Sequence, residues 1–203
     1  MDNFIVSARK YRPATFHQVV GQNAITSTLQ NAIKNNHLAQ AFLFTGPRGV
    51  GKTTCARILA KTINCENLTE DLEPCDKCES CTSFNNNASF NIHELDGASN
   101  NSVEDVRGLI EQVRYAPQHG KYKVYIIDEV HMLTKEAFNA LLKTLEEPPA
   151  NVFFVLATTE AHKIPETIIS RCQRFDFRRI AETDIAGRLD FIASSEKIKF
   201  EKE

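Results

Sequence analysis

The sequence lacks any apolar run long enough to cross a bilayer, and its first residues lack the hydrophobic segment of a secretory signal. No internal repeat and no low-complexity segment is present. The net charge is -2 over 203 residues, so the composition gives no sign of nucleic-acid binding, and any such contact must come from local patches or partners. We expect a cytoplasmic protein whose 42% apolar residues build a sizeable core.

Disulfide bonds are not favoured either, because a chain in the cytosol keeps its cysteines reduced. Of six cysteines, Cys55 and Cys172 stand alone and the other four fall in one short segment. Four thiolates in a short loop suit a tetrahedral Zn²⁺ with every position filled by protein, which is typical of a structural site. Buried free thiols, a redox pair and an iron–sulfur cluster are the alternatives. The predicted zinc ligands are Cys65, Cys75, Cys78 and Cys81.

A glycine-rich segment stands between an apolar strand and a segment of helix-forming residues. It reads GPRGVGKT and fits G-x-x-x-x-G-K-[ST]. In that context the glycines let backbone N–H groups close around phosphate oxygens, and the helix start adds partial positive charge. A glycine-rich turn that fits by chance is the alternative. We predict nucleotide contacts from Gly46, Pro47, Arg48, Gly49, Val50, Gly51, Lys52, Thr53 and Thr54.

Two acidic residues at the end of a hydrophobic strand give a second nucleotide signal. Lys52 can reach the β- and γ-phosphates, and the Thr53 hydroxyl can ligate Mg²⁺. Asp128 would hold the same Mg²⁺ through water or through Thr53, and Glu129 would polarise the water that attacks the γ-phosphate. A solvated acidic strand end is the alternative. His131 follows closely, and we assign it no role.

Five predicted strands alternate with helices, and several strands are continuously apolar, which predicts a parallel sheet covered on both faces. The strands are Ala41 to Thr45, Asn91 to Leu95, Lys123 to Ile127, Asn151 to Ala157 and Arg174 to Phe177. The helices run from about Asn23 to Asn35, from the glycine-rich loop to about Asn64, from the capping box Ser102-x-x-Asp105 to about Tyr115, over Phe138 to Leu145, and around Ile185 to Ile192.

Three further segments have weaker signals. Arg9 to Pro13 is predicted to be an extended arm, because a proline biases the residue before it away from helix. Thr158 ends the fourth strand and could bond the attacking water or the γ-phosphate, although threonine is common in strands. Arg171 could reach a neighbouring subunit's nucleotide, although a salt-bridged surface arginine is the alternative.

Taken in order, these motifs closely resemble the gamma/tau family of bacterial DNA polymerase III clamp-loader subunits, which are AAA+ ATPases. The resemblance covers about Val6 to Phe177. It is carried by Arg12-Pro13, Val19 to Gln22, the phosphate loop, the four-cysteine insert, Asp128 to His131, Asn139 to Pro149, Ala157 to Thr159 and Ser170 to Cys172.

The resemblance implies a P-loop AAA+ domain over 1–179 with a zinc-binding insert at 65–81, then the truncated start of a small helical lid over 180–203. It implies ATP, Mg²⁺ and Zn²⁺ as cofactors. It also implies loading of a sliding clamp onto primed DNA together with other clamp-loader subunits. Site roles implied by the family are the adenine side for Tyr11, Arg12 and Val20, the sensor threonine for Thr158, and an arginine finger acting in trans for Arg171.

Two departures from the family pattern limit these expectations. The second sensor arginine and the collar domain would lie beyond Glu203, so we expect a fragment with poor activity of its own. Gly97 to Asn101 lacks the basic residues of a DNA-facing loop. A branch-migration helicase of the same superfamily and a nucleotide-locked scaffold without turnover are the alternatives. The cysteine insert speaks against the first, and the intact phosphate-loop and acidic residues speak against the second.

Overall fold

The computed structural model describes residues 6–117 and 120–198, which contain one five-stranded sheet. The strand order is β2-β3-β4-β1-β5, and every neighbouring pair is parallel. This confirms the predicted fold class, and each predicted strand end is correct to within one residue. The strands are β1 (Ala41–Thr45), β2 (Ile92–Asp96), β3 (Lys123–Asp128), β4 (Val152–Thr158) and β5 (Gln173–Asp176).

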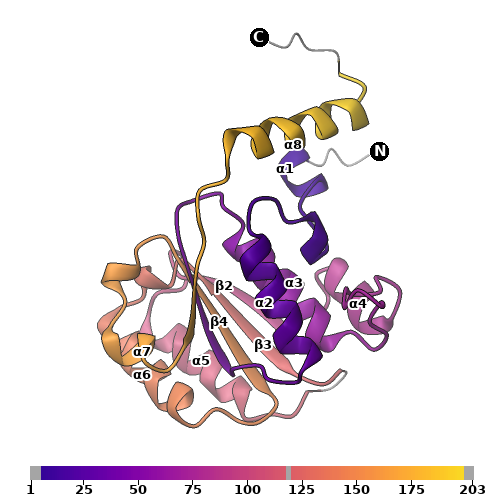
Figure 1. Ribbon diagram of the computed structural model, residues 1–203. Helices are drawn as coiled ribbons and strands as arrows, with labels where there is room; N and C mark the ends of the chain where they lie inside the picture. Colours follow the sequence, from indigo (N-terminus) through magenta and orange to yellow (C-terminus); the bar gives the residue numbers. More distant parts are fainter. Residues whose placement is uncertain (1–5, 118–119, 199–203) are drawn as a thin grey trace.

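Helices cover both faces of the sheet. Figure 1 shows α2 and α3 on one face, with α5, α6 and α7 on the other. The longer helices are α2 (Asn23–Lys34), α3 (Lys52–Asn64), α5 (Val103–Val113), α6 (Lys135–Glu146) and α8 (Glu182–Ser195). The short ones are α1 (Ser7–Lys10), α4 (Glu79–Asn85), α7 (Glu166–Ile169) and the 3-10 turns η1 (Phe16–Gln18), η2 (Val130–Met132) and η3 (Ala161–Lys163).

The apolar strands divide their side chains between two cores. Phe42 and Phe44 of β1 pack in the same buried cluster as Leu59 of α3. Leu43, between them, belongs to the opposite cluster with Leu141 of α6. Successive side chains of a strand point to opposite faces, so a sheet covered on both sides needs continuously apolar strands. The two cores fix the sheet, and the loops at the carboxyl ends of its strands share one edge.

The prediction of an extended arm over Arg9 to Pro13 is wrong at its start, because Ser7–Lys10 form the helix α1. A proline restricts only the residue before it, which leaves earlier residues free to be helical. A tertiary contact holds α1 in place, since Lys10 Nζ lies 2.7 Å from Glu196 Oε1, just after α8. Figure 1 shows α1 and α8 together above the sheet.

Two other helices stand apart from the sheet. The predicted helix around Ile185 to Ile192 is α8, and none of its residues is buried in this chain. The helix α4 was not predicted, because its seven residues carry no clear apolar period; it buries Cys81 and Phe84 and packs on α3. Within the described residues 6–117 and 120–198, no helix has the length and apolar character needed to span a membrane.

Candidate functional site

The phosphate loop connects β1 to α3 and depends on glycine for its shape. Gly46 has a φ of 143°, and a Cβ built there would lie 2.5 Å from the carbonyl oxygen of Phe177. Gly49 and Gly51 have φ values of 81° and 101°, in the region that residues with side chains rarely adopt. The glycines of the motif are therefore required by the backbone path and by the close approach of the segment after β5.

Lys52 lies at the centre of this loop. Its side chain is buried, and Nζ donates hydrogen bonds to the carbonyl oxygens of Gly46 at 2.8 Å and Pro47 at 2.7 Å. Burial lowers the pKa of Lys52, and the nearby carboxylates of Glu129 and Asp128 act in the opposite direction. The loop thus encloses a cation between two carbonyls and two acidic residues.

The predicted Mg²⁺ ligands are brought together. Thr53 Oγ1 donates to Asp128 Oδ2 at 2.6 Å, across the junction of α3 and β3. Asp128 Oδ1 accepts a hydrogen bond from the backbone N–H of Glu129 at 3.0 Å. A hydroxyl and a carboxylate are hard oxygen donors of the kind that Mg²⁺ prefers, so the residues present fit that ion.

Glu129 has a backbone conformation that is unusual for its residue type. Its φ and ψ are both 45°, in the left-handed region, which turns the chain sharply at the end of β3. Its carboxylate oxygen Oε2 accepts hydrogen bonds from Thr159, at 2.9 Å from the hydroxyl and 3.3 Å from the backbone N–H. The carboxylate is therefore held against the end of β4. No role is predicted for Thr159 from the sequence alone.

His131, to which we assigned no role, lies inside this cluster. Its Nδ1 is 3.1 Å from Thr158 Oγ1 and 3.3 Å from Glu129 Oε2. Thr158 is fully buried, and its hydroxyl also accepts from the backbone N–H of Glu160 at 3.0 Å. The sequence pattern that could have indicated this role is a histidine two residues after the acidic pair. The pattern alone does not show that His131 reaches Thr158, because that contact depends on the turn at Glu129.

Arg171 lies away from this cluster. It is exposed, its Nη2 lies 2.6 Å from Glu146 Oε1, and its Nη1 donates to the carbonyl of Thr167 at 2.6 Å. Among the described residues, its hydrogen bonds and its ion pair involve neither the phosphate loop nor the acidic pair. Within one chain, Arg171 therefore has the salt-bridged surface position that was the alternative prediction.

The three residues predicted for the adenine side differ in their exposure and contacts. The Tyr11 hydroxyl donates to Glu196 Oε1 at 2.8 Å, and its ring lies edge-on to Phe191 of α8 at 6.4 Å. Arg12 is exposed, and Val20 is half-buried. Tyr11 thus joins the N-terminal segment to α8.

Gln22 connects three segments around the loop, and sequence reasoning gave it no role. It is 4% exposed, and its Nε2 donates to the carbonyl of Arg178 at 2.7 Å and to that of Val50 at 3.4 Å. Its Oε1 accepts from the backbone N–H of Arg178 at 3.3 Å. The side chain therefore ties the segment before α2 to the phosphate loop and to the chain that leads to α8.

The four predicted zinc ligands converge. All four Sγ atoms lie within 4.8 Å of one another, and those of Cys65 and Cys78 are 4.0 Å apart. Zn–S bonds of about 2.3 Å in a tetrahedron place the sulfurs about 3.8 Å apart, so the cluster fits Zn²⁺. Backbone N–H groups of Lys77 and Cys78 donate to Cys75 Sγ and lower the pKa of that thiol to about 6. Such donors favour the thiolate that binds metal.

The insert that carries these cysteines is attached to the segment before α2. Glu73 is 7% exposed, and its two carboxylate oxygens accept hydrogen bonds from the backbone N–H groups of Phe16 and His17, each at 2.9 Å. A second attachment is the ion pair between Lys61 of α3 and Asp76. The insert therefore supports η1, which leads directly to the residues around Gln22.

We expect Glu73→Ala to lower the free energy of unfolding by about 2 kcal/mol, because it leaves buried backbone N–H groups without acceptors. Chemical unfolding monitored by circular dichroism would measure this loss. The matched variant Glu73→Gln keeps one acceptor oxygen and should lose less. Equal stability of Glu73→Ala and the unsubstituted protein would contradict this account of the attachment.

Comparison with known proteins gives a consistent result at the level of sequence. A family model described as "DNA polymerase III, delta subunit" matches residues 21–181. DNA polymerase III subunit tau of Bacillus subtilis is 54% identical over 96% of this chain and 34% of that protein. DNA polymerase III subunit tau/gamma of Haemophilus influenzae is 49% identical over 98% of this chain and 29% of that protein. The chain spans about a third of the length of these two relatives.

Solved structures support the fold. The RuvB Holliday junction branch migration motor of Thermotoga maritima aligns with a TM-score of 0.66 at 21% identity, over 94% of this chain and 56% of that one. At this identity the likeness concerns the P-loop AAA+ fold alone.

Proposed function

Because this chain belongs to the DNA polymerase III delta-subunit family, we propose that it is an ATP-binding and ATP-hydrolysing motor subunit of the clamp loader. In this proposal the complete protein uses ATP to load a sliding clamp onto primed DNA during replication. The observation that carries it is the pairing of Thr53 and Asp128 beside Lys52, with the Glu129 carboxylate at the adjoining strand end.

The phosphate loop would bind the triphosphate. Its backbone N–H groups and the start of α3 favour negative charge, and Lys52 would pair with the β- and γ-phosphates. Thr53 and Asp128 would hold Mg²⁺, which supplies charge neutralisation at the phosphate oxygens when bound. Gly46 to Thr54 keep the nucleotide-binding roles predicted for them.

Glu129 is proposed as the residue that orients and polarises the attacking water. It is the carboxylate next to the proposed Mg²⁺ ligand, and its backbone turn directs it toward the end of β4. Thr158 would sense the γ-phosphate from the last position of that strand. Its hydroxyl contacts His131, which in turn contacts Glu129, so sensor and base are joined through one imidazole.

Arg171 is proposed to act on the nucleotide of a neighbouring subunit. Its exposure, and its contacts with Thr167 and Glu146 in place of its own phosphate loop, support a role in trans. Tyr11, Arg12 and Val20 are proposed for the adenine side.

The division into an AAA+ domain (1–179) and the start of a lid (180–203) is likewise a proposal, supported by the exposed apolar residues of α8. The four cysteines would hold a structural Zn²⁺ and take no part in hydrolysis.

The proposed partners are the other clamp-loader subunits, the sliding clamp and primed DNA, and the proposed location is the cytoplasm. The names of the relatives support this assignment. A nucleotide-dependent scaffold without turnover is the second candidate, since Glu129 is already bonded within the chain. A branch-migration helicase is less well supported, because its resemblance concerns the fold alone.

The decisive experiment measures ATP hydrolysis by the full-length protein assembled with its partner subunits, with and without sliding clamp and primed DNA. We expect a several-fold stimulation that requires both. Hydrolysis that is indifferent to the clamp would contradict the clamp-loader proposal. An assembly that binds ATP tightly and never hydrolyses it would favour the scaffold.

A further inference from the structure

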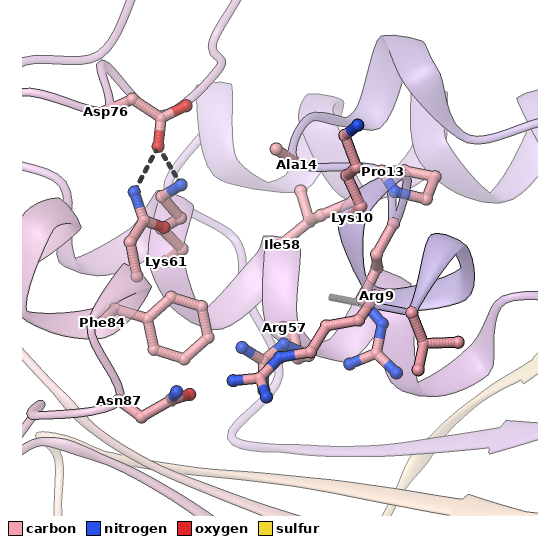
Figure 2. Close-up of a pocket in the computed structure, with 13 residues that line it drawn as sticks. Arg9, Lys10, Pro13, Ala14, Arg57, Ile58, Lys61, Asp76, Phe84 and Asn87 are labelled. Atoms are coloured by element: carbon pink, nitrogen blue, oxygen red, sulfur yellow. Dashed lines mark hydrogen bonds and ion pairs between the residues drawn. The ribbon is translucent and has the colours of Figure 1, made fainter. Parts of the chain in front are cut away.

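A second concave site in this chain is rich in positive charge. The pocket has a volume of about 1260 Å³ and lies between α1, α3 and the zinc-binding insert (Figure 2). No residue of the phosphate loop lines it, and of the residues proposed for the nucleotide site it shares Arg12 alone. Its basic lining residues are Arg9, Lys10, Arg12, Arg57 and Lys61.

Carboxylates inside the chain neutralise only three of these five cations. The ion pairs are Lys10 with Glu196, Arg57 with Glu94, and Lys61 with Asp76. Arg9 and Arg12 are exposed and have no carboxylate within ion-pair distance among the residues that the structure describes. The pocket thus carries a local excess of two positive charges in a chain whose net charge is -2.

The arginine at the floor of the pocket is held in position. The guanidinium carbon of Arg57 lies 4.7 Å from the ring centroid of Phe84, and its side chain is 21% exposed. Its Nη1 donates to Glu94 Oε1, and stacking of this kind leaves the other N–H groups of the guanidinium edge able to donate hydrogen bonds. Figure 2 shows Arg57 at the floor, with Arg9 extending into the same pocket from α1 and Asn87 at its rim.

Apolar groups lie between the cations. Ile58, Phe84 and Pro13 line the pocket together with the arginines. Grooves that bind single strands combine cations for the phosphates with apolar or aromatic surface for sugars and bases. The planar guanidinium groups favour phosphate, and a duplex is too wide to enter a pocket of this size. We propose that this pocket binds the sugar–phosphate backbone of a single-stranded nucleic acid.

The proposal stands independently of ATP, so its test uses no nucleotide. Binding of a fluorescein-labelled single-stranded oligothymidine to the full chain is measured by anisotropy between about 50 and 200 mM salt. Each phosphate contact contributes a slope of about -0.7 to the logarithm of affinity against the logarithm of salt concentration. Arg9→Ala should therefore reduce the slope by about 0.7, and the double variant Arg9→Ala with Arg12→Ala, which removes both cations that have no carboxylate partner among the described residues, by about 1.4.

The matched control replaces two exposed cations outside the pocket, Lys34→Ala with Lys135→Ala, and should leave the slope unchanged. Among the residues that the structure describes, Arg9 has no side-chain hydrogen bond or ion pair to lose, so its variant remains informative even if the double variant impairs folding. An unchanged slope in folded Arg9→Ala protein would overturn the proposal. So would an oligoglutamate peptide whose binding is lost in these variants while oligothymidine binding stays constant, since the ligand would then be an acidic peptide. ATP hydrolysis measured in parallel separates this result from the fate of the proposed motor activity.

Discussion

Glu129→Gln is expected to slow ATP hydrolysis by about 100-fold or more while leaving ATP affinity nearly unchanged. Glutamine keeps the size of the side chain and its carbonyl can still accept the hydrogen bond from Thr159, but it cannot take up a proton from water. Lys52, Thr53 and Asp128 retain their contacts in this variant, so the phosphates are bound as before. Steady-state hydrolysis and nucleotide affinity in the assembled full-length complex measure the two quantities separately.

The control is Glu136→Gln, an exposed carboxylate near the start of α6 that contacts none of these groups. It should hydrolyse ATP at the unsubstituted rate. Unchanged hydrolysis in Glu129→Gln would remove Glu129 from its proposed role. An equal loss of ATP affinity in that variant would mean that the carboxylate organises the site and does not act on water.

Loss of the proposed Zn²⁺ is the second large effect that we expect. A ligand present at 1,000 times its dissociation constant stabilises a protein by about 4 kcal/mol, so removing Zn²⁺ should lower the free energy of unfolding by about that amount. Cys81→Ser should do the same, because Cys81 is fully buried at the start of α4 and supplies one of four sulfurs. Metal content by mass spectrometry and chemical unfolding with and without chelator test both statements.

Cys172→Ala is the matched control, since Cys172 is a free cysteine outside the cluster. It should keep one zinc per chain and respond to chelator like the unsubstituted protein. Full stability of Cys81→Ser protein that contains no zinc would refute a structural metal. Iron in place of zinc in the purified protein would shift the assignment to the iron–sulfur alternative.

The sheet and the phosphate loop were predictable because their signals are local. β1, β3 and β4 each contain a continuous apolar run, AFLF, VYII and VFFVLA, and such a run predicts a buried strand without knowledge of its partners. The capping box at Ser102 and Asp105 is likewise a local pattern, and both of its reciprocal hydrogen bonds are present. The cysteine spacing predicted convergence of the four sulfurs for the same reason.

The short helices were not predictable, because tertiary contacts stabilise them. α1 has four residues and is stabilised by the contact of Lys10 with Glu196. α4 has seven residues and is stabilised by burial of its own Cys81 and by packing on α3. Isolated helices of this length are marginal in water, so propensity carries little information about them. For the same reason, the hydrogen bonds between the Glu73 carboxylate and η1 could not be predicted, because His17 lies 56 residues earlier in the chain.

The arrangement of the candidate catalytic cluster could be predicted only in part. Lys52, Thr53 and Asp128 follow from motifs whose chemistry fixes the residue types. The contacts of His131 with Thr158 and Glu129 depend on the left-handed turn at Glu129, which no pattern in the sequence specifies. A residue that acts through a neighbouring strand can be recognised only when the strand pairing is known.

If Arg171 acts in trans as proposed, its ion pair with Glu146 has a consequence for the order in which subunits join. A surface ion pair contributes about 0–1 kcal/mol, whereas a triphosphate offers several charges to the same guanidinium. In the isolated subunit, Arg171 would therefore stay paired with Glu146 of its own α6. It would leave this ion pair readily when a neighbouring subunit with bound nucleotide joins. A neighbouring subunit without nucleotide offers no phosphate to replace the carboxylate of Glu146. Nucleotide binding in one subunit would in this way change the next subunit, because Arg171 exchanges its weak ion pair with Glu146 for a stronger interaction with the triphosphate.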